Sequence, residues 1–346
     1  MGSALIGDPR PHARREMPPS PAVAALEALR PDLEAHCRTR FGVPDATLAS
    51  AEPVPGGHSG FTYRVCVTGT GLSRRLVVRI PPPGTRPRGP ADVVRQGRIM
   101  AALRDAGVPV PAVPLVVEGE ATRVGRPFIA MEEVPGEDVE QAVGRLGPER
   151  VLEEAVVALR SVQAVPPARL PLEERPMSLE SELARWQWLM ERAPEDLLAG
   201  SRALHARLAG RRPAERAPCL VHGDFHYGNL IFGGPGVAAI VDWEIAEIGQ
   251  PLLDYACLGV VALRRRFQGD PNPGGAVAVS PEQVRELSGA PGEEFAYYLA
   301  LTCFKYSAIL GYNLRLHLTG RRPDPIYPAL TATIYGLLEV GLEVLS

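Results

Sequence analysis

The sequence predicts an α+β protein in which a small β-rich part comes first and a larger, mostly helical part follows. Up to about residue 132, several short segments in which apolar and polar residues alternate lie around a glycine-rich turn. Such alternation is typical of half-buried strands. From about residue 148 onwards, apolar residues recur mainly at helical spacing. Pro135 and Gly136 stand between the two patterns, where a boundary between elements is expected.

Apolar residues at helical spacing predict a leading helix from Ala22 to about Phe41, which Gly42 and Pro44 end. The other expected elements of the first part are strands near 47–52, 61–67, 75–80, 114–118 and 127–132 and a helix over 91–106. In the second part, helices are expected over 148–163, 178–192, 195–210, 292–318 and 325–345.

Composition is that of an ordinary globular protein. The 346 residues are 45% hydrophobic, which suffices for two domains or one large two-lobed unit. The formal net charge is only -3, so no overall positive field favours nucleic acid or an anionic membrane as a partner. We therefore expect a small-molecule partner, and a monomer or homodimer.

The five cysteines are scattered and form no CxxC pair: Cys37, Cys66, Cys219, Cys257 and Cys303. Such separated thiols indicate a reducing, cytoplasmic location, without a disulfide framework or zinc site. The longest apolar run, Tyr255 to Leu263, falls short of the roughly 18 residues that a membrane span needs. Residues 1–20 lack a signal-peptide core and are expected to form a flexible tail.

A glycine-rich turn lies between the first two expected strands. Gly56, Gly57 and Gly60 would let backbone N–H groups approach phosphate oxygens without a Cβ in the way. His58 and Ser59, at its tip, are candidates for touching phosphate. An ordinary hairpin turn has the same composition, so this stretch alone does not establish a nucleotide site.

The most informative stretch reads CLVHGDFHYGNLIFGGPGVAAIVDWE. It places Asp224 five residues before Asn229, and it places Asp242 directly after an apolar segment. If 230–232 and 238–241 are the strands of a hairpin, Asn229 leads into one and Asp242 closes the other, so both side chains arrive at the same end. A carboxylate can take a hydroxyl proton, while a carboxamide and a second carboxylate are oxygen ligands suited to Mg²⁺.

A simpler interpretation is that His222 and Asp224 only cap a turn. The whole constellation is more specific than any one residue: HGDFHYGN followed by IVDWE resembles the aminoglycoside phosphotransferase and choline kinase-like family. Within that family, the chain is most similar to kinase-type domains found beside acyl-CoA dehydrogenase modules. The resemblance implies the two-lobed protein-kinase fold, with a β-rich N-lobe over 21–132 and a larger helical C-lobe over 133–346.

The resemblance also implies an activity, the ATP- and Mg²⁺-dependent transfer of a γ-phosphate to a hydroxyl of a small molecule. Asp224 is then the catalytic base, Asn229 and Asp242 hold the metal, and the glycine-rich turn covers the nucleotide. The family often has Asn where Gly60 stands, which leaves side-chain contact at that position open. ATP and GTP are not distinguished by these residues.

Arg79 stands where a kinase places its phosphate-anchoring lysine. Lys305 is the only lysine in the chain and lies at the wrong end, so Arg79 is the one credible occupant, although a solvated arginine at a strand end is the alternative. Arginine offers phosphate a planar fork rather than a point charge. Gln96 occupies the position of the glutamate that pairs with this anchor. It can orient Arg79 by a hydrogen bond but offers no ion pair, so either the coupling between the lobes is looser or Asp92 substitutes, and the effect on activity is left open.

Residues 132–136 are the expected hinge. In the kinase fold, adenine forms hydrogen bonds to the hinge backbone, which here implies Glu132 and Val134, with Met131 and Ile129 as apolar contacts.

Asp254 follows Asp242 too closely to leave room for the long activation segment with which protein kinases present a polypeptide. Protein phosphorylation is therefore disfavoured, and small-molecule kinases do without this segment. Residues 249–256 match the family's GxPxxDxA pattern, in which Asp254 is structural. Glu244 is expected either to reach the metal or acceptor through water or to form a surface salt bridge.

In this family the last two helices build the acceptor pocket. These helices carry many aromatic residues, and their few carboxylates are opposed by basic residues. This composition favours an acceptor with an apolar or neutral polar body over a polycationic aminoglycoside. The identity of the acceptor has no sequence motif. Trp186 and Trp188 are expected to pack between helices.

A second hypothesis is a catalytically weak or silent kinase-like protein that binds a nucleotide or metabolite. Arg79 and Gln96 favour it, whereas the complete set of Asp224, Asn229 and Asp242 favours an enzyme.

Overall fold

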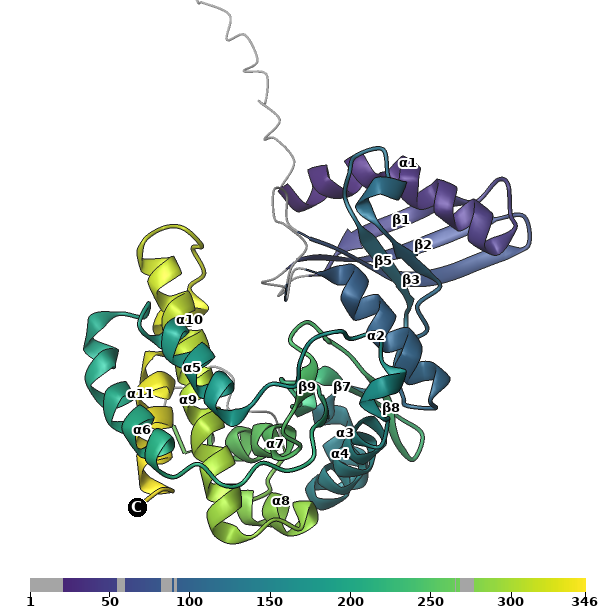
Figure 1. Cartoon of the computed structure of the whole chain (residues 1–346). Helices are drawn as coiled ribbons and strands as arrows, with labels where there is room; N and C mark the ends of the chain where they lie inside the picture. The colour runs from purple at the N-terminus through teal and green to yellow at the C-terminus, as the bar shows by residue number, and fades with distance from the viewer. Residues whose placement is uncertain (1–20, 55–59, 82–88, 90–91, 265, 268–276) are drawn as a thin grey trace, which may run out of the picture.

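A five-stranded antiparallel sheet forms the first part of the molecule (Figure 1). The computed structural model describes residues 21–54, 60–81, 89, 92–264, 266–267 and 277–346. The strand order is β1-β2-β3-β5-β4. These strands are β1 (Thr47–Pro53), β2 (Phe61–Gly69), β3 (Leu72–Ile80), β4 (Leu115–Val117) and β5 (Phe128–Glu132).

Two helices flank this sheet. Helix α1 (Pro21–Phe41) buries Leu26, Leu29 and Leu33 in one hydrophobic cluster with the sheet residues. Helix α2 (Val93–Asp105) lies between the sheet and the helical part, with contacts to β4 and β5 (Figure 1). Its buried side chains belong to the larger cluster of the helical part, so α2 packs against both parts of the molecule.

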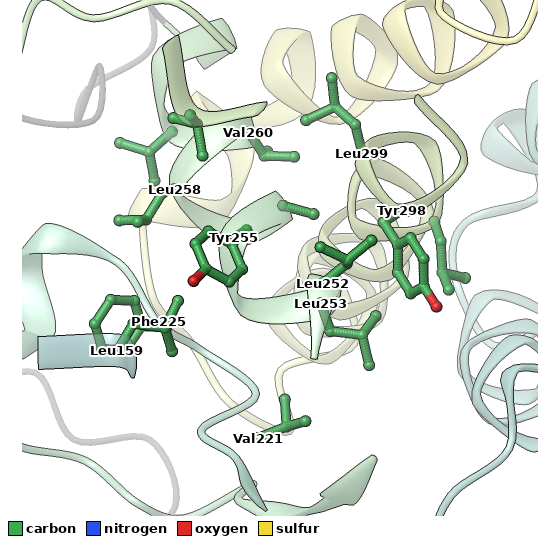
Figure 2. Packing of buried hydrophobic residues seen from close by; sticks show 14 of the residues in the cluster. Leu159, Val221, Phe225, Leu252, Leu253, Tyr255, Leu258, Val260, Tyr298 and Leu299 are labelled. Carbon is green, nitrogen blue, oxygen red and sulfur yellow. The ribbon is translucent and has the colours of Figure 1, made fainter. Parts of the chain in front are cut away.

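The second part is built mainly of helices. They are α3 (Val139–Leu146), α4 (Pro148–Gln163), α5 (Leu179–Met190), α6 (Leu198–Gly210), α7 (Leu252–Arg264), α8 (Pro281–Ser288), α9 (Gly292–Leu318), α10 (Ile326–Ala329) and α11 (Thr331–Glu343). Helix α7 lies in the middle of this part and is buried along nearly its whole length. Figure 2 shows Tyr255 of α7 turned toward Leu159 of α4 and Phe225 of the loop after β6.

Two small antiparallel ladders stand between the sheet and the helices. Strand β6 (Cys219–Val221) pairs with β9 (Glu247–Gly249), and β7 (Leu230–Gly233) pairs with β8 (Gly236–Ile240). The segment between β6 and β7, called the 222–229 loop below, ends in a 3₁₀ turn, Tyr227–Asn229.

The predicted α+β order is confirmed, and so are the leading helix, the five sheet strands and the β7–β8 hairpin. The expected single helix over 325–345 is wrong, because it is divided into α10 and α11 at Leu330. Leu330 has φ -85° and ψ 1°, which departs from α-helical geometry and separates the two helices. Helices α3 and α8 and the short β6–β9 ladder were not anticipated from the sequence.

The segment that joins the two parts is fastened to the hairpin. Glu137 and Phe232 exchange two backbone hydrogen bonds, N–H to O, of 2.7 and 2.9 Å. Gly136 lies against the same strand, where a Cβ would stand 2.4 Å from Ile231 Cγ2 and 2.5 Å from the Phe232 carbonyl oxygen. The close approach of the two backbones therefore requires glycine at this position.

We expect Gly136→Ala to lower the free energy of unfolding by roughly 1–3 kcal/mol, because the added methyl group overlaps backbone that cannot easily move. Gly144→Ala is the matched control: it lies inside α3 with nothing within 4 Å of the added Cβ. This control should gain about 0.5–1 kcal/mol from the better helix propensity of alanine. Urea unfolding measures both, and equal midpoints for the two variants would refute the close approach.

Candidate active site

One buried carboxylate organises the 222–229 loop. Asp254 of α7 accepts hydrogen bonds from the backbone N–H groups of His222 (2.8 Å) and Gly223 (2.9 Å). Its side chain is fully buried, and this burial raises its pKa to about 7, although the two N–H donors act in the opposite direction. Asp254 therefore has the structural role expected of it, because it holds the backbone directly before Asp224.

His222 joins this loop to the strand that leads to Asp242. Its Nδ1 accepts the N–H of Asp224 (3.2 Å), so its Nε2 must donate to the Val241 carbonyl oxygen (2.9 Å). Burial lowers the pKa of His222, which agrees with a neutral ring that uses one nitrogen as acceptor and the other as donor. The ring therefore ties two chain segments together rather than offering a proton to the site.

Asp224 projects from the loop with 30% of its side chain exposed. Tyr306 Oη donates to Oδ1 (2.7 Å), while His226 Nε2 and Asn229 Nδ2 both lie 3.4 Å from Oδ2. Burial acts to raise the pKa of Asp224, but His226, Lys305 and Tyr306 outweigh it and lower the pKa well below its usual range. Asp224 is therefore a carboxylate at neutral pH.

The hairpin brings Asn229 and Asp242 to the same end, as the sequence predicts. Leu230 pairs with Ile240, and the next residues outward are joined by a hydrogen bond from the Val241 N–H to the Asn229 carbonyl oxygen (2.9 Å). Asp242 follows directly. The expected juxtaposition is confirmed at the level of the backbone register.

The side chains of this pair suit a hard divalent cation. Asn229 Nδ2 donates to the Asp224 carbonyl oxygen (2.9 Å), and within the described residues its Oδ1 accepts no hydrogen bond. Asp242 has φ +67°, the one positive value outside glycine in the described chain. Such a conformation is strained for a residue with a Cβ and recurs at functional sites. A carboxamide oxygen and a carboxylate fit the one or two protein oxygens that Mg²⁺ takes beside nucleotide phosphates.

Arg79 of β3 spans from the sheet to the segment after β8. Its Nη1 donates to Asp242 Oδ1 (2.7 Å), and its Nη2 pairs with Glu244. Only 11% of the arginine side chain is exposed. Burial acts to lower the pKa of Arg79, but the two carboxylates prevail and raise it, so the guanidinium stays charged.

The contacts of Arg79, Glu244 and Asp92 decide two points that the sequence left open: the role of Glu244, and whether Asp92 replaces the missing glutamate. Glu244 forms a salt bridge, but to a buried arginine rather than on the surface. Asp92 does not substitute for the missing glutamate in the described structure, because it caps α2 by accepting the N–H of Arg95 (2.9 Å). Gln96 is buried on the same helix. The coupling between the two parts at Arg79 runs through carboxylates of the second part instead.

Four of the five residues expected in the glycine-rich turn lie outside the described residues: Gly56, Gly57, His58 and Ser59. Gly60 is described, and a Cβ there would stand 2.8 Å from the Ile80 carbonyl oxygen and 3.8 Å from Arg79 Nε. This position therefore has no room for a larger side chain beside Arg79.

The expected hinge follows β5. Met131 lies opposite Val77 in the sheet, and the N–H of Glu132 donates to the Ala112 carbonyl oxygen (2.8 Å). Within the described residues, the backbone of Val134 makes no hydrogen bond. Of the expected hinge residues Glu132 and Val134, only Val134 thus offers an N–H that is not already engaged.

A cavity of about 1030 Å³ opens beside Asp224. Much of its wall is apolar, with side chains from α5, α9, α11 and β9: Trp186, Leu189, Ile248, Ile309, Leu310 and Leu337. Trp186 packs in the core as expected, whereas Trp188 is exposed, so the expected packing of Trp188 between helices is wrong. Both tryptophans also line this cavity.

Four charged side chains of the wall form two ion pairs with one another. Arg185 binds Glu247 through two hydrogen bonds (2.7 and 2.8 Å) and also pairs with Glu182. Arg95 binds Glu174 (2.7 Å). These pairs offset part of the charge that lines the cavity.

Sequence reasoning missed Lys305, Tyr306 and His226, which surround Asp224. No motif marks the first two, which lie about eighty residues further along the chain; the one signal was that Lys305 is the chain's only lysine. In the described part of the chain, no group of three or more His, Cys, Asp or Glu side chains is placed to hold a metal ion. None of the described helices combines the length and hydropathy needed to cross a membrane.

Comparison with known proteins gives a consistent result. The model of the phosphotransferase enzyme family matches residues 50–287. Mouse acyl-CoA dehydrogenase family member 10 is 27% identical over 285 residues, which are 77% of this chain and 26% of that protein. Rat acyl-CoA dehydrogenase family member 11 is 24% identical over 300 residues, 79% of this chain and 38% of that protein. The chain thus spans well under half the length of these curated relatives.

Solved structures resemble the whole chain. A candidate aminoglycoside phosphotransferase from Ralstonia eutropha JMP134 superposes with a TM-score of 0.72 at 22% identity, over 91% of this chain and 97% of that one. A thermostable mutant of aminoglycoside phosphotransferase APH(4)-Ia, in ternary complex with ADP and hygromycin B, gives 0.58 at 16% identity, over 90% and 99%. These similarities confirm the predicted two-lobed, protein-kinase-like α+β fold.

The raised pKa of Asp254 predicts a pH-dependent stability. Between the usual carboxyl pKa and about 7, the folded protein binds more protons than the unfolded chain, so this contribution is present at low pH and is lost as the pH rises through about 7. Lys305 opposes the shift and Asp224 reinforces it. We expect the stability of the wild type relative to Asp254→Asn to fall by about 2 kcal/mol between pH 5 and pH 7.

Urea unfolding at a series of pH values measures this difference. Asp105→Asn, which removes a carboxylate at the exposed end of α2, is the control. A wild-type advantage over Asp254→Asn that stays constant with pH would contradict the prediction.

Proposed function

Since the chain belongs to the phosphotransferase enzyme family, we propose that it transfers the γ-phosphate of ATP, with Mg²⁺, to a hydroxyl of a small molecule. One observation supports this most: the end of the β7–β8 hairpin brings Asn229 and Asp242 beside the loop that carries Asp224, at the mouth of a cavity. Phosphoryl transfer needs a base, oxygen ligands for a metal and room for an acceptor.

Asp224 is the proposed base. Its Oδ1 is engaged by Tyr306, which leaves Oδ2 to take the proton of the acceptor hydroxyl. Asn229, through Oδ1, and Asp242, through its carboxylate, would hold Mg²⁺. When bound, this ion offsets the negative charge that develops on the phosphate oxygens.

Arg79 is the proposed phosphate anchor. Its guanidinium forms ion pairs with Asp242 and Glu244. Arrival of a nucleotide would replace these carboxylates by phosphate oxygens, which a guanidinium binds equally well through its planar fork. Asp242 would then become available to the metal. Gly60 keeps the space beside Arg79 open for the phosphates, and the neighbouring turn residues 56–59 would cover them.

The proposed adenine contact is the hinge. The unengaged N–H of Val134 supports a hydrogen bond to the base, with Met131 as an apolar contact. We place the division between an N-lobe (21–132) and a C-lobe (133–346) at this hinge. The ADP bound in the related aminoglycoside phosphotransferase complex supports nucleotide binding by this fold.

The acceptor is proposed to be uncharged over most of its surface. The cavity wall is largely apolar, and three of the six carboxylates that line it already bind arginines: Glu174 to Arg95, Glu247 to Arg185 and Glu244 to Arg79. A polycation would need free carboxylates to replace its lost hydration. An alcohol with an apolar or neutral body loses less on entering such a cavity and gains from burial of its apolar surface.

A nucleotide-binding protein without effective catalysis is the second candidate. The ion pair of Arg79 with Asp242 favours it, because a proposed metal ligand is occupied at rest. Mg·ATP would raise the melting temperature in both cases, but only an enzyme would also release ADP.

We expect Asp224→Asn to lower the rate of ADP release from Mg·ATP at least 100-fold while leaving nucleotide affinity within about twofold, because general-base catalysis contributes roughly 10²–10⁴-fold and the base does not contact the nucleotide. Asp196→Asn, exposed and outside the cavity, is the control. Coupled-enzyme detection of ADP and a binding titration separate the two effects. Turnover retained by Asp224→Asn would disprove the mechanism, and no ADP release by the wild type with any acceptor would favour the second candidate.

Neutral apolar alcohols should be better acceptors than polycationic aminoglycosides. We expect kcat/KM at least tenfold higher for the best neutral alcohol of a panel, since one unpaired buried charge costs more than 1.4 kcal/mol. ADP release is measured with each compound at equal concentration. Efficient turnover of an aminoglycoside, with none of any neutral alcohol, would show that the paired charges of the wall rearrange on binding.

A further inference from the structure

Helix α9 reaches the 222–229 loop with two consecutive residues. Tyr306 Oη donates a 2.7 Å hydrogen bond to Asp224 Oδ1, while its ring lines the cavity. The other oxygen, Oδ2, has its polar neighbours, His226 Nε2 and Asn229 Nδ2, at 3.4 Å. At that distance a hydrogen bond is weak. Tyr306 therefore makes the two carboxylate oxygens unequal, with Oδ2 the less engaged.

Lys305 acts on the backbone of the same loop. Its Nζ donates to the Gly223 carbonyl oxygen, and only 3% of the residue is exposed. The ammonium also lies 5.5 Å from the ring centres of Trp186 and Tyr306, where a cation is attracted to the aromatic face. Burial acts to lower the pKa of Lys305, but nearby groups, among them Asp224, raise it, so the charge persists.

The choice of lysine at this point is informative. Of the 37 lysine and arginine residues in the chain, Lys305 alone is lysine. A general need for positive charge is met by arginine everywhere else. An ammonium is compact and points three donors from a narrow stem, whereas a guanidinium is a broad planar fork. Lysine thus places a compact cation at the Gly223 carbonyl oxygen.

Helix geometry explains how adjacent residues serve two purposes. Consecutive side chains diverge by about 100° around a helix, so Lys305 passes beneath the loop while Tyr306 enters the cavity. Helix α9 packs against α5, α7 and α11, and a side chain on such a fixed element is held more precisely than one on a loop.

We propose that Lys305 and Tyr306 are positioning residues that orient Asp224, Lys305 by fixing the backbone before it and Tyr306 by holding Oδ1 so that Oδ2 faces the acceptor hydroxyl. The inference rests on the proposed function, because it concerns the base of that reaction. Their hydrogen bonds go to the Gly223 carbonyl oxygen and to Asp224 Oδ1, so their effect falls on the base, which they orient and keep ionised.

The test uses the full chain with Mg·ATP alone, so that water is the acceptor and no unidentified ligand is needed. Tyr306→Phe should lower kcat for ATP hydrolysis about 10- to 100-fold, the range expected for losing a hydrogen bond to a charged group. KM for Mg·ATP should stay within twofold. Tyr312→Phe, on the same helix and outside the cavity, should leave both unchanged.

Lys305→Met provides a second, independent variant. It should lower kcat at least tenfold with unchanged affinity for Mg·AMP-PNP, because the loop backbone loses its anchor while the nucleotide site stays intact. If this variant does not fold, Tyr306→Phe decides the question, since it removes a single oxygen atom.

The outcomes separate the inference from the function on which it rests. A wild type that hydrolyses no ATP and phosphorylates no acceptor overturns the proposed function and the inference together. A wild type that turns over, with kcat of Tyr306→Phe equal to that of Tyr312→Phe, overturns the inference alone. A Tyr306→Phe variant that loses melting temperature but keeps its kcat per folded molecule shows a purely structural role and also overturns it.

Discussion

The end of the β7–β8 hairpin is the constraint on which the rest of the site depends. A backbone hydrogen bond between Val241 and Asn229 fixes where the strands stop, and the neutral ring of His222 ties that point to the loop carrying Asp224. Asp254, from the buried core around α7, holds the same loop through two N–H groups. The backbone positions of the three residues proposed for catalysis are therefore fixed by these contacts, as a preorganised site requires.

Arg79 forms ion pairs with Asp242 and Glu244 that join the two parts of the molecule. A kinase-like anchor is expected to pair with a glutamate of the neighbouring helix, but here Gln96 stands on that helix and the arginine turns to Asp242 and Glu244 of the second part. The pair is only partly exposed, so both charges have lost much of their hydration and each depends on the other. A nucleotide and its metal would relieve this dependence by supplying phosphate to the arginine and a cation to the carboxylate. The interaction thus links the two parts of the molecule to the proposed ligand.

Features that depend on local spacing could be predicted from the sequence. Patterns a few residues long predict the hairpin, the proximity of Asn229 to Asp242 and the position of Arg79 on its strand. They do so because side chains along a strand alternate between the two faces of the sheet with a fixed period of two. The partners of these residues could not be predicted. Glu244 beneath Arg79, and Lys305 and Tyr306 around Asp224, come together only through packing of distant helices. The break at Leu330 was missed because the helical pattern continues through Pro328, and the cavity wall has no motif at all.

The proposed mechanism requires that the hairpin end receives Mg²⁺ and nucleotide phosphate. A crystal structure with Mg²⁺ and the non-hydrolysable analogue AMP-PNP tests it most directly. We expect Mg²⁺ about 2.1 Å from an oxygen of Asn229 and an oxygen of Asp242. Arg79 should then bind a phosphate instead of the carboxylates of Asp242 and Glu244. A complex in which Arg79 still bridges Asp242 and Glu244, with the nucleotide bound away from the hairpin, would contradict it.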